Sequence, residues 1–183
     1  MEELAKDILV RASQGDMQAF EEVYKRTSGF VYNVAYRIVN NREDAMEVAQ
    51  EVFMTVHDKL KEFRFESSFN TWLYRITANR AINYAKKFSR IKTMPFEESF
   101  GDAAVPSDAE KTIEQEEQKH LVEKLLGELN EDQRACVVLR EIQGLSYEEI
   151  AQALNININT VRSRLKRSRE KLMSLKKSIY EKL

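Results

Sequence analysis

Apolar residues recur at helical spacing through the N-terminal half of the chain. Gly15 ends a first short helix, and the Asp16 carboxylate predicts an N-cap for the next one. The apolar stripe of this second helix stops at the asparagine pair 40–41. A third helix, at 44–60, has the clearest period, with apolar residues three or four positions apart. This half of the chain is therefore expected to be a helical bundle.

Aromatic, amide and basic side chains are mixed in the segment that follows. A short polar loop at 64–70 leads into a helix that contains Trp72, Arg75, Asn79 and Lys87. Some of its large apolar side chains are expected in the core. The remainder suits unpaired nucleic acid, because bases stack on aromatic faces, amides bond base edges and cations neutralise phosphates. The segment 64–87 therefore favours binding to single strands.

A helix-turn-helix is predicted between Ser146 and Arg167. Ser146 and Glu149 form the S-x-x-E pattern of a capping box, which opens a helix of barely two turns. Asn155 and Asn157 interrupt this helix, and a second helix is expected to begin at Asn159. Its arginines and lysines lie outside the apolar seam, as in a recognition helix that enters the major groove. This segment predicts binding to duplex DNA.

Composition supports an all-helical protein. The 183 residues include only five glycines and two prolines, whereas good helix formers are plentiful. Asn130 predicts the N-cap of a further helix, which is expected to carry Ala135, Val138, Leu139 and Ile142 and to end at Gly144. A hydrophobic content of 43% is enough to pack a core and too high for a disordered chain.

The net charge of −1 conceals segments of opposite sign. Residues 59–92 hold nine basic and two acidic side chains, and residues 159–183 hold the same numbers, a net of +7 in each. Between them, residues 93–118 hold eight acids, one base and both prolines, which is typical of a linker. We therefore expect two small helical domains, at 1–92 and 113–183, joined by a flexible acidic linker at 93–112.

Several kinds of chemistry lack their usual residues. The sequence has no glycine-rich phosphate loop, no nucleophile paired with a base and no metal-ligand spacing around His57 or His120. We therefore expect neither an enzyme nor a bound cofactor or metal. Cys136 lies in an apolar run and is expected to be a small buried side chain. No signal peptide or membrane span is expected, which favours a cytoplasmic protein.

Four segments resemble the extracytoplasmic-function sigma factors of the sigma-70 family. They are DAMEVAQEVF at 44–53, FNTWLYRI at 69–76, LSYEEIA at 145–151 and TVRSRL at 160–165, in the family's order. The resemblance implies an alternative sigma factor, of the kind used in stress responses, that binds core RNA polymerase and directs promoter-specific initiation. Region 2 is expected in the N-terminal domain and region 4 in the C-terminal one.

The resemblance also implies roles for individual residues. The beta-prime clamp of the polymerase is expected to bind Asp44, Glu47, Gln50, Glu51 and Phe53. The minus-ten strand is expected to be melted and captured by Arg64, Phe65, Ser67, Ser68, Phe69, Trp72, Arg75, Asn79 and Asn83. The minus-thirty-five duplex is expected to contact Arg140, Thr160, Arg162, Ser163, Arg164, Lys166 and Arg167. The acidic linker would approach the polymerase active site. The beta flap and an anti-sigma factor complete the expected partners.

Two departures and one alternative accompany this interpretation. Asn83 stands where many relatives have Asp, and Phe65 stands where a small residue such as Gly is frequent, so the resemblance leaves the minus-ten sequence open. The alternative is a transcription regulator whose N-terminal domain senses a ligand or dimerises while the helix-turn-helix binds an operator. The aromatic and basic segment 64–87 distinguishes the two, because a regulator does not need it.

Overall fold

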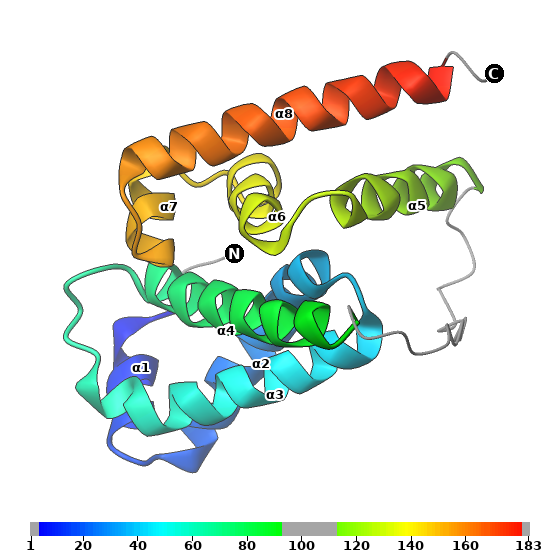
Figure 1. Ribbon diagram of the computed structural model, residues 1–183. Coiled ribbons are helices and arrows are strands. Elements are labelled where there is room, and N and C mark those ends of the chain that lie inside the picture. The colour runs from blue at the N-terminus through cyan, green and yellow to red at the C-terminus, as the bar shows by residue number, and fades with distance from the viewer. Residues whose placement is uncertain (1–3, 93–112, 181–183) are drawn as a thin grey trace.

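The computed structural model describes residues 4–92 and 113–180, and all regular elements in these ranges are helices (Figure 1). The predicted all-helical class is confirmed. The linker predicted at 93–112 lies outside the described residues. The helices form an N-terminal lobe, which contains α1 to α4, and a C-terminal lobe, which contains α5 to α8.

The N-terminal lobe is built on three long helices. They are α2 (Met17–Val39), α3 (Arg42–Lys59) and α4 (Phe69–Lys92), each packed against the other two. The short α1 (Lys6–Ser13) lies against α2, and a 3-10 turn, η1 (Leu60–Glu62), follows α3. The predicted apolar stripes form the core, which includes the fully buried residues Val23, Val31, Val34, Ile38, Ala45, Val48, Val52, Val56 and Leu73.

Side-chain caps set the predicted helix boundaries in this lobe. An oxygen of Asp16 accepts hydrogen bonds from the backbone amides of Gln18 and Ala19 at 2.9 and 3.0 Å, which starts α2. Asn40 takes the left-handed conformation that ends α2, and the Asn41 side chain accepts from the amide of Asp44 to start α3. These breaks were predicted from residue type alone, and they are confirmed.

The C-terminal lobe contains the predicted helix-turn-helix. Its elements are α5 (Ile113–Gly127), α6 (Glu131–Val137), a π-helical turn η2 (Val138–Ile142), α7 (Tyr147–Leu154) and α8 (Ile158–Tyr180). Ser146 and Glu149 form both halves of the predicted capping box, and Asn155 ends α7 in the left-handed conformation. The second helix begins one residue earlier than predicted, because the Asn157 side chain accepts from the amide of Asn159.

The helix predicted from Asn130 is present, but its geometry changes along its length. It is α-helical from Glu131 and becomes a π-helix at Val138. A π-helical turn contains an additional residue, which rotates the following side chains around the axis. Leu139 is therefore fully buried, while Ile142 is 36% exposed.

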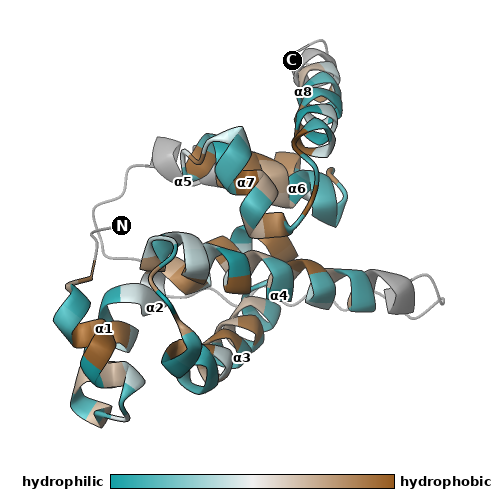
Figure 2. Cartoon of the chain, turned by 90° about the vertical axis from the view of Figure 1, so that its left-hand side faces the viewer, coloured by the Kyte–Doolittle hydropathy of each residue, from teal (hydrophilic) through white to brown (hydrophobic). Residues whose placement is uncertain are grey.

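The two lobes are packed against each other. In both views α6 and α7 lie next to α4 (Figures 1 and 2), and α6 also contacts α2. Arg134 of α6 is 9% exposed and donates from one nitrogen to the carbonyl of Ile38, in the last turn of α2, at 2.9 Å. A second nitrogen of the same guanidinium donates to the carbonyl of Leu129 at 2.9 Å. The buried guanidinium of Arg134 therefore links the last turn of α2 in the N-terminal lobe to the residues that precede α6 in the C-terminal lobe.

Candidate nucleic-acid and polymerase-binding surfaces

An aromatic cluster supports the loop that precedes α4. The Phe63 ring centroid lies 4.8 Å from that of Phe65, 5.9 Å from that of Phe69 and 5.2 Å from that of Trp72. Phe69 is only 2% exposed and Trp72 is half-buried, so these two predicted minus-ten residues mainly hold the shape of the loop. Phe65 is 39% exposed and presents its ring at the edge of the cluster.

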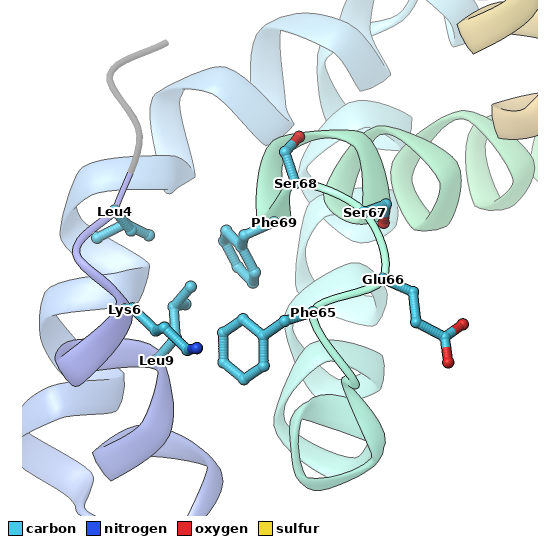
Figure 3. A pocket seen from close by; sticks show the side chains of 8 residues that line it. All are labelled: Leu4, Lys6, Leu9, Phe65, Glu66, Ser67, Ser68 and Phe69. Carbon is cyan, nitrogen blue, oxygen red and sulfur yellow. The ribbon is translucent and has the colours of Figure 1, made fainter.

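A pocket lies between this loop and α1 (Figure 3). It has a volume of about 670 Å³ and is lined by Leu4, Lys6, Leu9, Phe65, Glu66, Ser67, Ser68 and Phe69. The Lys6 ammonium lies over the Phe65 ring, 5.1 Å from its centroid, whereas the Glu66 carboxylate points away from both. The Ser68 hydroxyl accepts from the amide of Thr71 at 3.1 Å, so Ser68 caps the start of α4.

The predicted minus-ten residues on α4 do not share one open surface. Arg75 and Asn83 are exposed. Asn79 is half-buried, and its amide donates to the carbonyl of Ala153 in α7 at 3.0 Å. The buried Tyr74 hydroxyl donates to Gln143 at 3.2 Å, and burial raises the pKa of this phenol. The C-terminal lobe therefore covers part of the surface that the sequence assigned to DNA.

Three of the predicted polymerase-binding residues of α3 are paired with side chains of α4. The Tyr84 hydroxyl lies 3.1 Å from an oxygen of Asp44 and 2.7 Å from one of Glu47, and burial raises the pKa of this phenol well above its usual range. Glu51 pairs with Arg80 of α4 at 3.3 Å, and Gln50 is exposed.

The expectation for Phe53 needs correction. This side chain is 8% exposed and packs against the Tyr24 ring, with 4.6 Å between the centroids. Its position in the apolar stripe of α3 turns it into the core of the lobe, so it supports the polar face instead of belonging to it. The predicted polymerase-binding residues that remain at the surface of α3 are therefore Asp44, Glu47, Gln50 and Glu51.

The recognition helix presents most of the predicted duplex-binding residues. Arg162, Ser163, Lys166 and Arg167 are exposed near the start of α8, whereas Val161 and Leu165 are buried and fix its orientation. Thr160 is half-buried. Arg140 lies on the preceding π-turn, where it donates to the carbonyl of Leu145 at 2.8 Å and lies 5.2 Å from the Tyr147 ring.

One acidic residue neutralises cations of both lobes. The Asp132 carboxylate, at the start of α6, lies 2.9 Å from the ammonium of Lys86 in α4 and 3.4 Å from the guanidinium of Arg164 in α8. The roles of Asp132, Arg134 and Lys6 were not predicted from the sequence. Their partners are distant in the chain, and no local pattern marks them.

The described residues contain no group of three or more His, Cys, Asp and Glu side chains able to hold a metal. His57 is exposed and packs edge-on against the Phe20 ring, 5.1 Å between centroids, and His120 is exposed too. Cys136 is fully buried, as predicted, and burial raises the pKa of its thiol to about 11. None of the helices in residues 4–92 and 113–180 is long and apolar enough to span a bilayer.

Comparisons with known proteins agree with the resemblance. The family descriptions "Sigma-70 region 2" and "Sigma-70, region 4" match residues 23–91 and 119–172. The chain is 37% identical to the ECF RNA polymerase sigma-E factor of Escherichia coli (strain K12). The alignment spans 179 residues and covers 92% of this chain and 93% of that protein. The chain is 33% identical over 177 residues to the RNA polymerase sigma-H factor of Pseudomonas aeruginosa, with 92% of each covered.

Solved structures show the same fold. The sigma factor RpoE of Bartonella quintana, in complex with the anti-sigma factor NepR, matches with a TM-score of 0.66 and 25% identity, covering 86% of this chain and 96% of that one. CnrH in complex with the cytosolic domain of CnrY matches with a TM-score of 0.66 and 24% identity, covering 93% and 96%. The relatives are transcription factors and not enzymes. The chain belongs to the extracytoplasmic-function sigma factors of the sigma-70 family, which direct transcription initiation by RNA polymerase.

Proposed function

We propose that this chain gives core RNA polymerase its specificity for one class of promoter by gripping two forms of DNA. Residues 1–92 act as region 2 and capture the unpaired minus-ten strand. Residues 113–183 act as region 4 and bind the minus-thirty-five duplex, and residues 93–112 link the two. The observation that carries the proposal is the presence, on one chain, of an exposed aromatic loop before α4 and a basic recognition helix.

The minus-ten function rests on the exposed side chains around the loop. Arg64, Phe65 and Ser67 are exposed in the loop, and Arg75 and Asn83 are exposed on α4. They offer a stacking face, cations and an amide, which are the groups that bind unpaired bases and their phosphates. The buried rings of the aromatic cluster hold this surface in place.

The minus-thirty-five function rests on the start of α8. Arginine pairs bidentately with guanine in the major groove, and lysine neutralises phosphates. Arg162, Lys166 and Arg167 are exposed for both kinds of contact, and Arg164 joins them when its guanidinium leaves the carboxylate of Asp132. Arg140 lies on a separate turn and is suited to the DNA backbone, because its guanidinium is held by a carbonyl and a ring.

The proposed partners follow from the family and from the acidic surface of α3. We assign Asp44, Glu47, Gln50 and Glu51 to the beta-prime clamp of the polymerase, while the beta flap binds region 4. An anti-sigma factor is a further proposed partner, because one matching solved structure is a complex of the sigma factor RpoE with the anti-sigma factor NepR. The proposal places the chain in the cytoplasm and in a stress response.

Run-off transcription with purified core polymerase tests the function. The template is selected by this chain from a randomised promoter library, and transcripts are measured with and without the chain. We expect transcripts only in its presence. Selection of no template, or equal transcription by core polymerase alone, would contradict the proposal.

Two variants separate the DNA-binding steps. Arg75→Ala with Asn83→Ala is expected to abolish promoter opening, measured by permanganate reactivity, while leaving duplex binding intact, because both side chains are exposed on α4. Arg164→Ala is expected to cost about 1–3 kcal/mol at the upstream element if it contacts a base. A uniform loss across all upstream sequences would assign Arg164 to phosphates alone.

A further inference from the structure

The first helix forms one wall of the pocket beside the minus-ten loop. Although α1 precedes residues 23–91, which match region 2, its segment contributes Leu4, Lys6 and Leu9 to the pocket (Figure 3). Lys6 is exposed, and its ammonium covers the Phe65 ring. Phe63 is an aromatic neighbour of that ring, tilted by 56°. A base can use the outer face of Phe65 only if Lys6 moves.

We propose that Lys6 moves from the Phe65 ring to a backbone phosphate when an unpaired base enters this pocket. This inference rests on the proposed minus-ten function and adds a positioning residue from outside the family match. An exposed cation–π contact is weak, whereas stacking of a base on an aromatic ring is stronger. The flexible stem of lysine allows its ammonium to follow the phosphate. The exchange therefore replaces the weak contact between Lys6 and the Phe65 ring with two stronger ones. These are the stack of the base on Phe65 and the ion pair of Lys6 with the phosphate.

The pocket has the size and lining that a single nucleotide needs. Its volume of about 670 Å³ lies within the range of small-molecule sites. Leu4 and Leu9 provide an apolar wall, and Ser67 is among the lining residues of the loop. The Glu66 carboxylate points away from Lys6 and so leaves the ammonium available for an anion.

Salt dependence of binding tests the role of Lys6. The probe is a fluorescent single-stranded oligonucleotide with the minus-ten sequence of the selected promoter, and anisotropy is measured over a range of salt. For single strands each phosphate contact adds about 0.7 to the slope of log K against log salt, or about fivefold in affinity at 0.1 M. Lys6→Gln should lower the slope by this amount, whereas Lys6→Arg should preserve it.

Lys25→Gln is the matched control, because Lys25 is an exposed lysine that pairs with Glu21 on α2 and does not line the pocket. It should leave the slope unchanged. A wild-type slope for Lys6→Gln overturns the role of Lys6, even if affinity falls. Failure of the wild-type chain to bind the oligonucleotide would instead count against the proposed minus-ten function.

The packing of the lobes carries a second inference, independent of the pocket. Three polar contacts cross from α4 to the C-terminal lobe, from Tyr74, Asn79 and Lys86. Asn79 is one of the residues that the family resemblance assigned to the minus-ten strand, and its amide is already bonded to the carbonyl of Ala153. A base that uses this amide must displace α7 from α4.

The geometry points to an autoinhibited arrangement in which Asp132 holds the lobes closed until the unpaired strand competes for Lys86. This too rests on the proposed minus-ten function. The side chains of Asp132 and Lys86 are 28% and 41% exposed, so solvent and phosphates have access to the ion pair. A protein whose competent form is only partly populated binds with an affinity reduced by that fraction. Weakening the closed form should therefore strengthen strand binding.

Two changes in the C-terminal lobe test this arrangement in the full chain. Asp132→Asn removes the ion pairs with Lys86 and Arg164, and Gln143→Ala removes the uncharged contact with Tyr74. Without DNA, both variants should increase the radius of gyration measured by X-ray scattering. Both should also bind the minus-ten oligonucleotide more tightly, by roughly threefold, the effect expected from one partly exposed polar contact.

Glu128→Gln controls for the change in charge, because Glu128 is exposed in the same lobe and its side chain has none of these contacts. It should change neither the radius nor the affinity. Tighter binding by Asp132→Asn alone, with no expansion of either variant, overturns the inference in favour of a general charge effect. Unchanged values for both variants overturn it as well.

Discussion

Phe65 adopts a backbone conformation that its residue type disfavours. Asn40, Phe65 and Asn155 have positive φ angles of 60°, 57° and 52°. Asparagine often takes this left-handed region, whereas an ordinary side chain there costs about 1–2 kcal/mol. The two asparagines were therefore predicted as breaks from the sequence, and the strain at Phe65 was not. A strained residue beside a pocket is a frequent mark of a functional site.

Phe65→Gly should separate the structural and functional contributions of this residue. Glycine removes about 1–2 kcal/mol of strain, while loss of the ring removes contacts with Phe63 and Lys6 of similar total size. The free energy of unfolding, measured with denaturant, should therefore change by less than about 1 kcal/mol. Binding of the single-stranded minus-ten oligonucleotide should weaken by about 1–3 kcal/mol, because a stacking face is lost.

Phe65→Trp is the control for this experiment. It retains an aromatic face and should preserve strand binding within about threefold, since a base stacks on any aromatic ring. Equal strand binding by the glycine variant and the wild-type chain would remove Phe65 from the proposed minus-ten site.

At the level of elements, local patterns predicted the helices and most of their ends. Capping side chains act over two or three residues, so Asp16, Asn130 and Ser146 are recognisable from the sequence. The π-turn after Val137 was not predicted, because no residue between Val138 and Ile142 breaks an α-helix. The sequence pattern therefore does not show that geometry.

The capping box that starts α7 makes a measurable contribution. Ser146 accepts a hydrogen bond from the amide of Glu149 at 3.1 Å, and Glu149 accepts one from the amide of Ser146 at 2.7 Å. Ser146→Ala should lower the free energy of unfolding by about 1 kcal/mol, measured with denaturant. Ser174→Ala on exposed α8 should have less effect, because it removes no cap. Equal losses would contradict the capping role.

The same cap predicts a dependence on pH. The hydrogen bond from the amide of Ser146, followed by that from its hydroxyl, lowers the pKa of Glu149 below its ordinary value of 4.5. The folded state therefore favours the carboxylate, and this stabilisation is present above pH 4.5 and lost as pH falls below it. Glu149→Gln should flatten the decline of stability in acid relative to the wild-type chain. Parallel curves for the two proteins would contradict this.

At the scale of the whole molecule, the sequence predicted two helical modules but not the contact between them. The contacting residues lie far apart in the chain, by 46 positions for Lys86 and Asp132 and by 96 for Ile38 and Arg134. Periodicity and capping patterns act over a few residues and carry no information on such pairs. As a result, α7 covers Asn79, whereas Arg75 and Asn83 on the same helix are exposed.

Arg134 should determine whether the lobes unfold together. Its hydrogen bonds to the carbonyls of Ile38 and Leu129 each contribute about 1.5–3 kcal/mol, partly offset by desolvation, which also lowers the pKa of this guanidinium. Arg134→Met keeps most of the volume and removes both bonds, so we expect a loss of about 1–3 kcal/mol. Calorimetry should then show two transitions in place of one. Arg167→Met is the exposed control, and a single unchanged transition for Arg134→Met would contradict this coupling.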